Sequence, residues 1–262
     1  MRVAKGIPAV LGGACLLGAG VLAWQVKRTV HRPDLPSFTN QDISGIFGDP
    51  AASPLRVVAV GDSSLTCPGL DDLDDAWLRR LARAYADRHR VELISLGVGG
   101  SRAQDVVDGQ LAAALALRPD IAVVSVGGND VIRGASRPQF AAALDHIVGR
   151  LEEASRAVLL IGVGDLGAIP RLPPALRPLL GARSAQLDRV AAGVAAAHPR
   201  TVKTIARGPR APFSPGEVAM FAADMFHASA VGHALMAAAT REGFDAAYHL
   251  AMSGAAAGAP GR

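Results

Sequence analysis

The sequence predicts an α/β domain in which a parallel five-stranded sheet lies between layers of helices. After residue 54, short runs of β-branched and apolar residues alternate with stretches of helical periodicity. The runs are almost unbroken by polar residues, as in strands that are covered on both faces. The connections are short, so right-handed crossovers would join the strands into one sheet.

The N-terminal segment precedes this domain and is predicted to enter a membrane. Residues 6–24 are apolar, and Arg2 and Lys5 stand before them. As a helix this run would be ~28 Å long, which matches the hydrocarbon core of a bilayer. We favour an uncleaved signal anchor with the domain outside the cytoplasm. Val21, Leu22 and Ala23 resemble a signal-peptidase cleavage site, which leaves a cleaved signal peptide and a secreted protein as the alternative.

The remaining chain divides into a linker, the α/β domain and a short tail. The linker contains four prolines and no clear periodicity, which is typical of irregular structure. The predicted boundaries are 1–32 for the anchor or signal segment, 33–54 for the linker, 55–252 for the domain and 253–262 for a flexible tail.

The strands and helices of the domain follow from local patterns. Tryptophan and leucine recur on one side of residues 76–88, Ser136 and Pro138 begin a second helix, and a last helix covers 230–252. The predicted strands are residues 56–60, 91–96, 121–126, 157–163 and 201–205.

Composition excludes several classes of function. The pI is 9.6, but the net charge is only +4 and the basic residues are scattered, so we expect no nucleic-acid partner. The two cysteines, Cys15 and Cys67, form no metal-binding cluster, and we expect neither a metal nor a cofactor. We interpret Cys67 as a loop or partly buried thiol, with a nucleophilic cysteine as the alternative. A GxGxxG pattern begins at Gly162, but prolines follow it where a dinucleotide site needs a helix.

Four short motifs follow predicted strands or stand near the C-terminus. In open parallel sheets ligands bind at the carboxyl ends of the strands, so these motifs are candidates for chemistry. Ser63 follows the first strand and Gly100 the second, where a glycine N–H can serve as an oxyanion donor. Asn129 follows the third strand and carries a neutral amide donor. In the last motif, Asp224 stands three residues before His227, close enough to orient its imidazole.

Together and in this order, the motifs over residues 55–252 resemble those of the SGNH or GDSL hydrolase family. The resemblance implies a flavodoxin-like α/β/α fold and an esterase or lipase activity through an acyl-enzyme. It implies that Ser63 is the nucleophile, His227 the base and Asp224 its orienting carboxylate. The backbone of Ser63 and Gly100 and the side chain of Asn129 would form the oxyanion hole.

The sequence departs from the family pattern at four positions. Ser64 stands where leucine is common, and Ser95 where an asparagine often begins the second motif. Met225 and Ala228 replace the glycine and proline that often surround the last histidine. None of these changes removes a catalytic group.

The substrate is predicted only as a small-molecule or lipid ester. The segment 164–183 is rich in proline and leucine, and we expect it either to form an apolar wall of the active site or to pack a helix into the core. A catalytically silent, membrane-bound protein that binds a glycan or lipid is the alternative function, and acyl transfer to an alcohol is another. The oligomeric state is not predicted.

Overall fold

The computed structural model describes residues 20, 21, 24, 34–204 and 216–257. Its centre is a six-stranded sheet in the order β1-β3-β2-β4-β5-β6, in which β2 to β6 are parallel and β1 is antiparallel to β3. The predicted α/β class with a mostly parallel sheet is therefore confirmed. The strands are β1 (Gly45–Phe47), β2 (Pro54–Gly61), β3 (Arg90–Ser95), β4 (Ile121–Ser125), β5 (Ala157–Leu160) and β6 (Thr201–Lys203).

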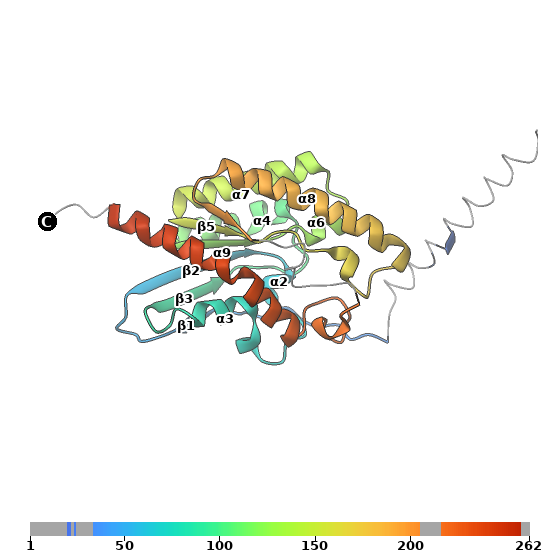
Figure 1. The fold of residues 1–262 in the computed structure, drawn as a ribbon, viewed down its shortest axis with the longest axis horizontal. Helices are drawn as coiled ribbons and strands as arrows, with labels where there is room; N and C mark the ends of the chain where they lie inside the picture. The colour runs from blue at the N-terminus through green and yellow to red at the C-terminus, as the bar shows by residue number, and fades with distance from the viewer. Residues whose placement is uncertain (1–19, 22–23, 25–33, 205–215, 258–262) are drawn as a thin grey trace, which may run out of the picture.

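Helices cover both faces of this sheet (Figure 1). Alternate residues of a strand point to opposite faces, and in β2 both sets are apolar. Val57 and Ala59 belong to one core cluster, whereas Val58 and Val60 belong to the other. This double burial explains why polar residues hardly interrupt the predicted strands.

The first core cluster lies under α3 (Trp77–Arg83) and α9 (Ala230–Ala257), and Trp77 and Phe244 are fully buried in it. The second lies under helices from the middle of the chain. These are α4 (Ala103–Gly109), α5 (Leu111–Ala116), α6 (Gly128–Ile132), α7 (Arg137–Ala154) and α8 (Arg177–Ala197). The short elements are α2 (Ser63–Thr66), η1 (Leu73–Asp75), η2 (Leu166–Ala168), η3 (Pro174–Leu176) and η4 (Val218–Met220).

The predicted five strands are all present, but the sheet has a sixth that we did not predict. Strand β1 comes from the predicted linker and pairs with the outer edge of β3. Ile43 is fully buried beside it, and the Gln41 side chain donates to the backbone oxygens of Cys67 and Leu70 at 2.9 Å each. The second half of the linker is thus packed on the domain.

The ends of the chain are described only in part. Helix α9 continues to Ala257, past the predicted end of the domain. No helix among the described residues is long and apolar enough to cross a membrane. The predicted membrane segment, residues 6–24, lies almost entirely outside the described residues, so it stays a prediction.

Candidate active site

The strand order brings three of the predicted motifs to one edge of the sheet. Strand β2 lies between β3 and β4, and all three are parallel, so their carboxyl ends are neighbours. The chain runs from β2 to β3 on one side and then crosses from β3 to β4 on the other side of β2, which makes the gap between β2 and β4 the topological switch point. Ser63 follows β2 and Asn129 follows β4. Both motifs therefore border the crevice where this fold binds ligands.

Ser63 is held by a tight turn between β2 and α2. A Cβ atom on Gly61 would lie 1.9 Å from the backbone oxygen of Ser125, so only glycine permits β2 and β4 to approach this closely. Asp62 then caps α2 by accepting a hydrogen bond from the Ser64 N–H at 3.0 Å. The Ser64 hydroxyl is bonded to that of Ser125 at 2.6 Å. Ser63, at the first position of α2, has no hydrogen-bond partner for its hydroxyl within the described part of the chain.

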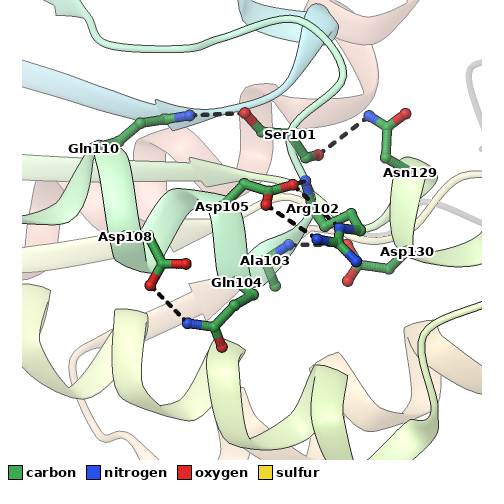
Figure 2. Close-up of polar contacts among 9 residues, drawn as sticks. All are labelled: Ser101, Arg102, Ala103, Gln104, Asp105, Asp108, Gln110, Asn129 and Asp130. Atoms are coloured by element: carbon green, nitrogen blue, oxygen red, sulfur yellow. Dashed lines mark hydrogen bonds and ion pairs between the residues drawn. The ribbon is translucent and has the colours of Figure 1, made fainter. Parts of the chain in front are cut away.

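The Gly100 loop is bonded to Asn129 of α6 and, through Gln110, to Gly61 at the end of β2. Gly100 has φ +84°, a left-handed conformation that favours glycine. Next to it, the Ser101 carbonyl accepts a hydrogen bond from Asn129 Nδ2 at 3.2 Å, and the Ser101 hydroxyl accepts one from Gln110 Nε2 at 3.1 Å (Figure 2). Gln110 also bonds both backbone groups of Gly61, at 2.8 and 2.9 Å. The second motif is thus fixed to the first and to the third.

Asp130, next to Asn129, completes this connection. Its Oδ2 accepts the backbone N–H of Ala103 at 3.0 Å, at the start of α4 (Figure 2). Burial raises the pKa of the Asp130 carboxyl. Arg102, drawn beside it, is paired with Asp105. Asp130 therefore positions the backbone of α4 and leaves the amide of Asn129 nearer to the crevice.

Asp224 and His227 are joined by hydrogen bonds through both the side chain and the backbone of His227. The His227 Nδ1 atom lies 2.6 Å from Asp224 Oδ2, while Asp224 Oδ1 accepts the N–H groups of Phe226 and His227 at 2.9 and 3.0 Å. Burial alone would raise the pKa of Asp224, but the hydrogen bonds from His227 and Phe226 outweigh it and hold that pKa below its usual value. Asp224 is therefore a carboxylate at neutral pH and can accept a hydrogen bond from His227 Nδ1.

The loop that carries this pair is pinned without the proline of the family pattern. Met225 has φ +58°, so a side chain occupies the left-handed position where the family often has glycine. The Ala222 N–H donates to the His227 oxygen at 2.8 Å, and Phe221 and Ala228 form an antiparallel bridge. These bonds fix the backbone on both sides of His227.

One cavity of about 150 Å³, here called the Ser63 cavity, brings the predicted residues together. Ser63, Asn129 and His227 line it, and Asp224 lies behind His227 with 2% of its surface exposed. Gly100 does not line it. No hydrogen bond joins Ser63 to His227, and such bonds often form only when substrate is present. Its other lining residues are Asp62, Ser64, Pro68, Gly128, Ile132, Leu166, Ile169, Phe226, Ala228, His233 and Met236.

Two rival groups near the cavity are poorly suited to catalysis. Cys67 is 1% exposed, and burial raises the pKa of its thiol to about 12, so it stays protonated. His233 lines the cavity, but burial, followed by the charge of Arg80, lowers the pKa of its imidazole to about 4. Within the described part of the chain its Nδ1 has no hydrogen-bond partner, so no carboxylate orients the ring through that atom. These properties support the interpretation of Cys67 as a buried thiol.

Sequence reasoning did not find the residues that hold the motifs in place. Gln110 is a single glutamine just after α4, with no motif around it. Asp62 and Asp130 lie within the motifs, next to Ser63 and Asn129, and that adjacency was the available signal. Their roles depend on contacts across the fold.

Comparisons with known proteins agree with this arrangement. The model of the GDSL-like lipase/acylhydrolase family matches residues 59–235. A GDSL-like esterase of Mycobacterium tuberculosis is 27% identical over 187 residues, which cover 70% of this chain and 59% of that protein. The chain thus spans less than two thirds of this relative's length.

Solved structures show the same fold. The crystal structure of a lipase/acylhydrolase from Enterococcus faecalis superposes with a TM-score of 0.57 at 25% identity, over 74% of this chain and 96% of the other. A catalytic mutant of an acetylxylan esterase from Geobacillus stearothermophilus superposes with a TM-score of 0.59 at 18% identity, over 74% and 96%. At 18% identity the second likeness concerns the fold alone.

Proposed function

Because the chain belongs to the GDSL-like lipase/acylhydrolase family, a family of enzymes that act on esters, we propose that it is a serine esterase with Ser63, His227 and Asp224 as its triad. The observation that carries the proposal is the Ser63 cavity, where Ser63, Asn129 and His227 meet while Asp224 binds the ring of His227. In this proposal Asp224 keeps the proton on Nδ1, so that Nε2 is the basic nitrogen.

The reaction has two halves. The Ser63 oxygen attacks the ester carbonyl carbon while His227 Nε2 takes the hydroxyl proton, and the carbonyl oxygen becomes an oxyanion. The alcohol leaves with the proton from His227, and a water molecule, deprotonated by His227, then releases the acid from Ser63. One N–H of Asn129 is bound to Ser101, and the other is the donor we assign to the oxyanion with the backbone N–H groups of Ser63 and Gly100.

The walls of the Ser63 cavity favour an apolar acyl group over a bare sugar. Five large apolar side chains line it, and two of them come from the segment 164–183, for which we expected either an apolar wall of the active site or a helix packed into the core. They are Ile132, Leu166, Ile169, Phe226 and Met236. We therefore propose carboxylic esters of aliphatic acids as the substrate class.

A fluorophosphonate probe combined with ester hydrolysis tests the triad. We expect Ser63→Ala to lose covalent labelling and at least about 10³-fold in turnover, since no other activated nucleophile is proposed. Ser64→Ala is the matched control and should be labelled, because its hydroxyl is bonded to Ser125. Labelling of the Ser63→Ala protein at wild-type level would overturn the assignment, and an unlabelled wild-type protein would favour a silent binding protein.

The two histidines of the cavity provide a second matched pair. We expect His227→Ala to be as inactive as Ser63→Ala. The His233→Ala variant should keep much of its activity, because no carboxylate of the described residues binds Nδ1 of His233. Initial rates on a short-chain ester, with circular dichroism as a check of folding, measure this difference. The reverse order of activities would show that the base is His233.

A further inference from the structure

A second cavity adjoins the Ser63 cavity. It encloses about 170 Å³ and is here called the Thr204 cavity. It lies where the strands β4, β5 and β6 end, against the N-terminal half of α9. It shares Asp62, Ser64, Gly128 and Met236 with the Ser63 cavity. Its other lining residues are Ser125, Val126, Ile161, Gly162, Val163, Gly164, Thr204, Ala239 and Thr240.

Most polar groups of the Thr204 cavity are already bonded within the protein. Ser64 and Ser125 bind each other, and the Thr204 hydroxyl oxygen accepts the Gly162 N–H at 3.2 Å. Asp62 accepts the Ser64 N–H. Burial raises the pKa of the Asp62 carboxyl to about 6. The cavity therefore has few free partners for a polar guest and suits an apolar one.

Met236 is the movable part of the wall between the two cavities. Asp62, Ser64 and Gly128 belong to the turn after β2 and to the start of α6, where their backbones are fixed by the contacts described above. Met236 projects from α9 and is partly buried. Its unbranched side chain has three rotatable bonds and adapts to different neighbours at low cost. A rotamer change of Met236 would join the cavities without moving the backbone.

We propose that the Thr204 cavity binds the distal part of a medium-length acyl chain whose carbonyl carbon lies at Ser63. An apolar cavity of about 150 Å³ accommodates a molecule the size of benzene, about six carbons. The Ser63 cavity has that size, so a longer chain must continue past Met236. Acids of about eight to ten carbons fit the two cavities together. This inference rests on the proposed esterase function for the position of the carbonyl group.

Filling the Thr204 cavity from α9 tests the inference. Ala239 lines the cavity, whereas its neighbour Ala238 is exposed and is the matched control. With the full-length protein in a detergent without ester bonds, kcat/KM is measured for p-nitrophenyl esters from acetate to decanoate. Each buried methylene contributes roughly fourfold to binding. We expect Ala239→Phe to lower kcat/KM for decanoate by at least about tenfold and for acetate by less than about twofold, with Ala238→Phe unchanged throughout.

Gly164 allows the same cavity to be filled from the opposite wall. A Cβ atom there would meet no heavy atom within 4 Å, and the backbone is not left-handed, so Gly164→Leu should fold even where Ala239→Phe does not. We expect the same loss, confined to the long esters. Equal losses at all chain lengths, or no loss with either variant, would overturn the inference. The inference would also be overturned if kcat/KM depended on the length of the alcohol part of the ester and not on the length of its acyl part.

Binding of free decanoic acid separates this inference from the proposed function. Calorimetry needs no turnover, and it should detect decanoate binding to the wild type and at least about tenfold weaker binding to the two cavity-filling variants. If decanoate binds in this way but no ester is hydrolysed, the cavity assignment stands and the esterase proposal fails. If acetate esters are hydrolysed but decanoate binds all variants equally, the esterase proposal stands and the cavity assignment fails.

Discussion

In the proposed mechanism, the side chain of Asn129 serves both the structure and the chemistry of the site. Its amide carries two N–H donors, and the bond to the Ser101 oxygen uses one of them. That bond orients the amide plane and joins the loop of Gly100 to α6. The second donor is then held in place before any charge develops, which is the condition for effective oxyanion stabilisation.

Replacing Asn129 by alanine should therefore affect turnover more than substrate binding. We expect Asn129→Ala to lower kcat by roughly 10²–10³-fold, the usual loss for one oxyanion donor, with KM changed by no more than a few-fold. Steady-state kinetics on a short-chain ester measure both parameters. The urea midpoint of unfolding serves as the control for the lost bond to Ser101. A large rise in KM at unchanged kcat would instead make Asn129 a binding residue.

The residues that we propose for the chemistry could be singled out from the sequence, whereas those that hold them in place could not. Ser63, Asn129 and His227 stand in short motifs whose residue types have few other uses together, and the fold brings them to one cavity. Gln110 acts through both backbone groups of Gly61 and through Ser101. Those partners lie far from it in sequence, and a pattern along the chain cannot express them.

At the scale of elements, burial decided what the sequence revealed. The strands β2, β4 and β5 are buried almost throughout and appear as apolar runs with few polar residues, so they were predicted. Strand β1 has three residues and lies at the edge of the sheet, where it needs only one partner and buries mainly Phe47. The helix predicted for residues 76–88 ends already at Arg83.

The turn between β2 and α2 makes stability depend on pH. The pKa of Asp62 is raised by burial from 3.8 to about 6, so folding favours the protonated carboxyl. The raised pKa of Asp62 therefore adds to the free energy of unfolding in full below pH 3.8, and this stabilisation is lost as the pH rises through about 6. The shift corresponds to up to about 3 kcal/mol at pH 7.

Asp62→Asn should remove this dependence, because an asparagine can still accept the Ser64 N–H and does not ionise. We expect the variant to gain stability relative to the wild type as the pH rises from 4 to 6, with the difference constant above pH 7. Urea unfolding of both proteins at pH 4.5, 5.5 and 7 measures the difference, in which all other titrating groups cancel. Parallel pH profiles of the two proteins would contradict the assignment.

At the scale of the whole molecule, topology explains why distant segments form one site. The strand order places the ends of β2 and β4 at the switch point, so the crevice lies there whatever sequence follows the strands. The loop of Asp224 and His227 reaches the same crevice from just before α9, which packs against α3 on the other side of the sheet from α7 and α8 (Figure 1). The order of the motifs along the sequence therefore indicated the candidate site, although no single motif was sufficient to do so.

The role of the N-terminal segment as a membrane anchor is a proposal that concerns the whole chain. We propose that residues 6–24 anchor the protein in a membrane with the domain outside the cytoplasm. An anchored protein should fractionate with membranes and resist extraction by high salt and alkaline carbonate, because insertion of nineteen mostly apolar residues is effectively irreversible. A mature N-terminus at Trp24, found by terminal sequencing together with activity in the exported soluble fraction, would show a cleaved signal peptide instead.

The structure defines where such an anchor can be removed. Deleting residues 1–32 keeps β1, the buried Ile43 and the two bonds of Gln41, so we expect a soluble and active domain. Deleting residues 1–53 removes all of these and uncovers the edge of β3, which should lower the free energy of unfolding by several kcal/mol, as loss of a buried isoleucine alone costs about 2–5 kcal/mol. Urea unfolding and ester hydrolysis by the two truncated proteins measure the difference. Equal stability of the two truncated proteins would mean that the packed half of the linker contributes nothing to the fold. We also expect the shorter protein to aggregate more readily, because the edge of β3 is exposed in it.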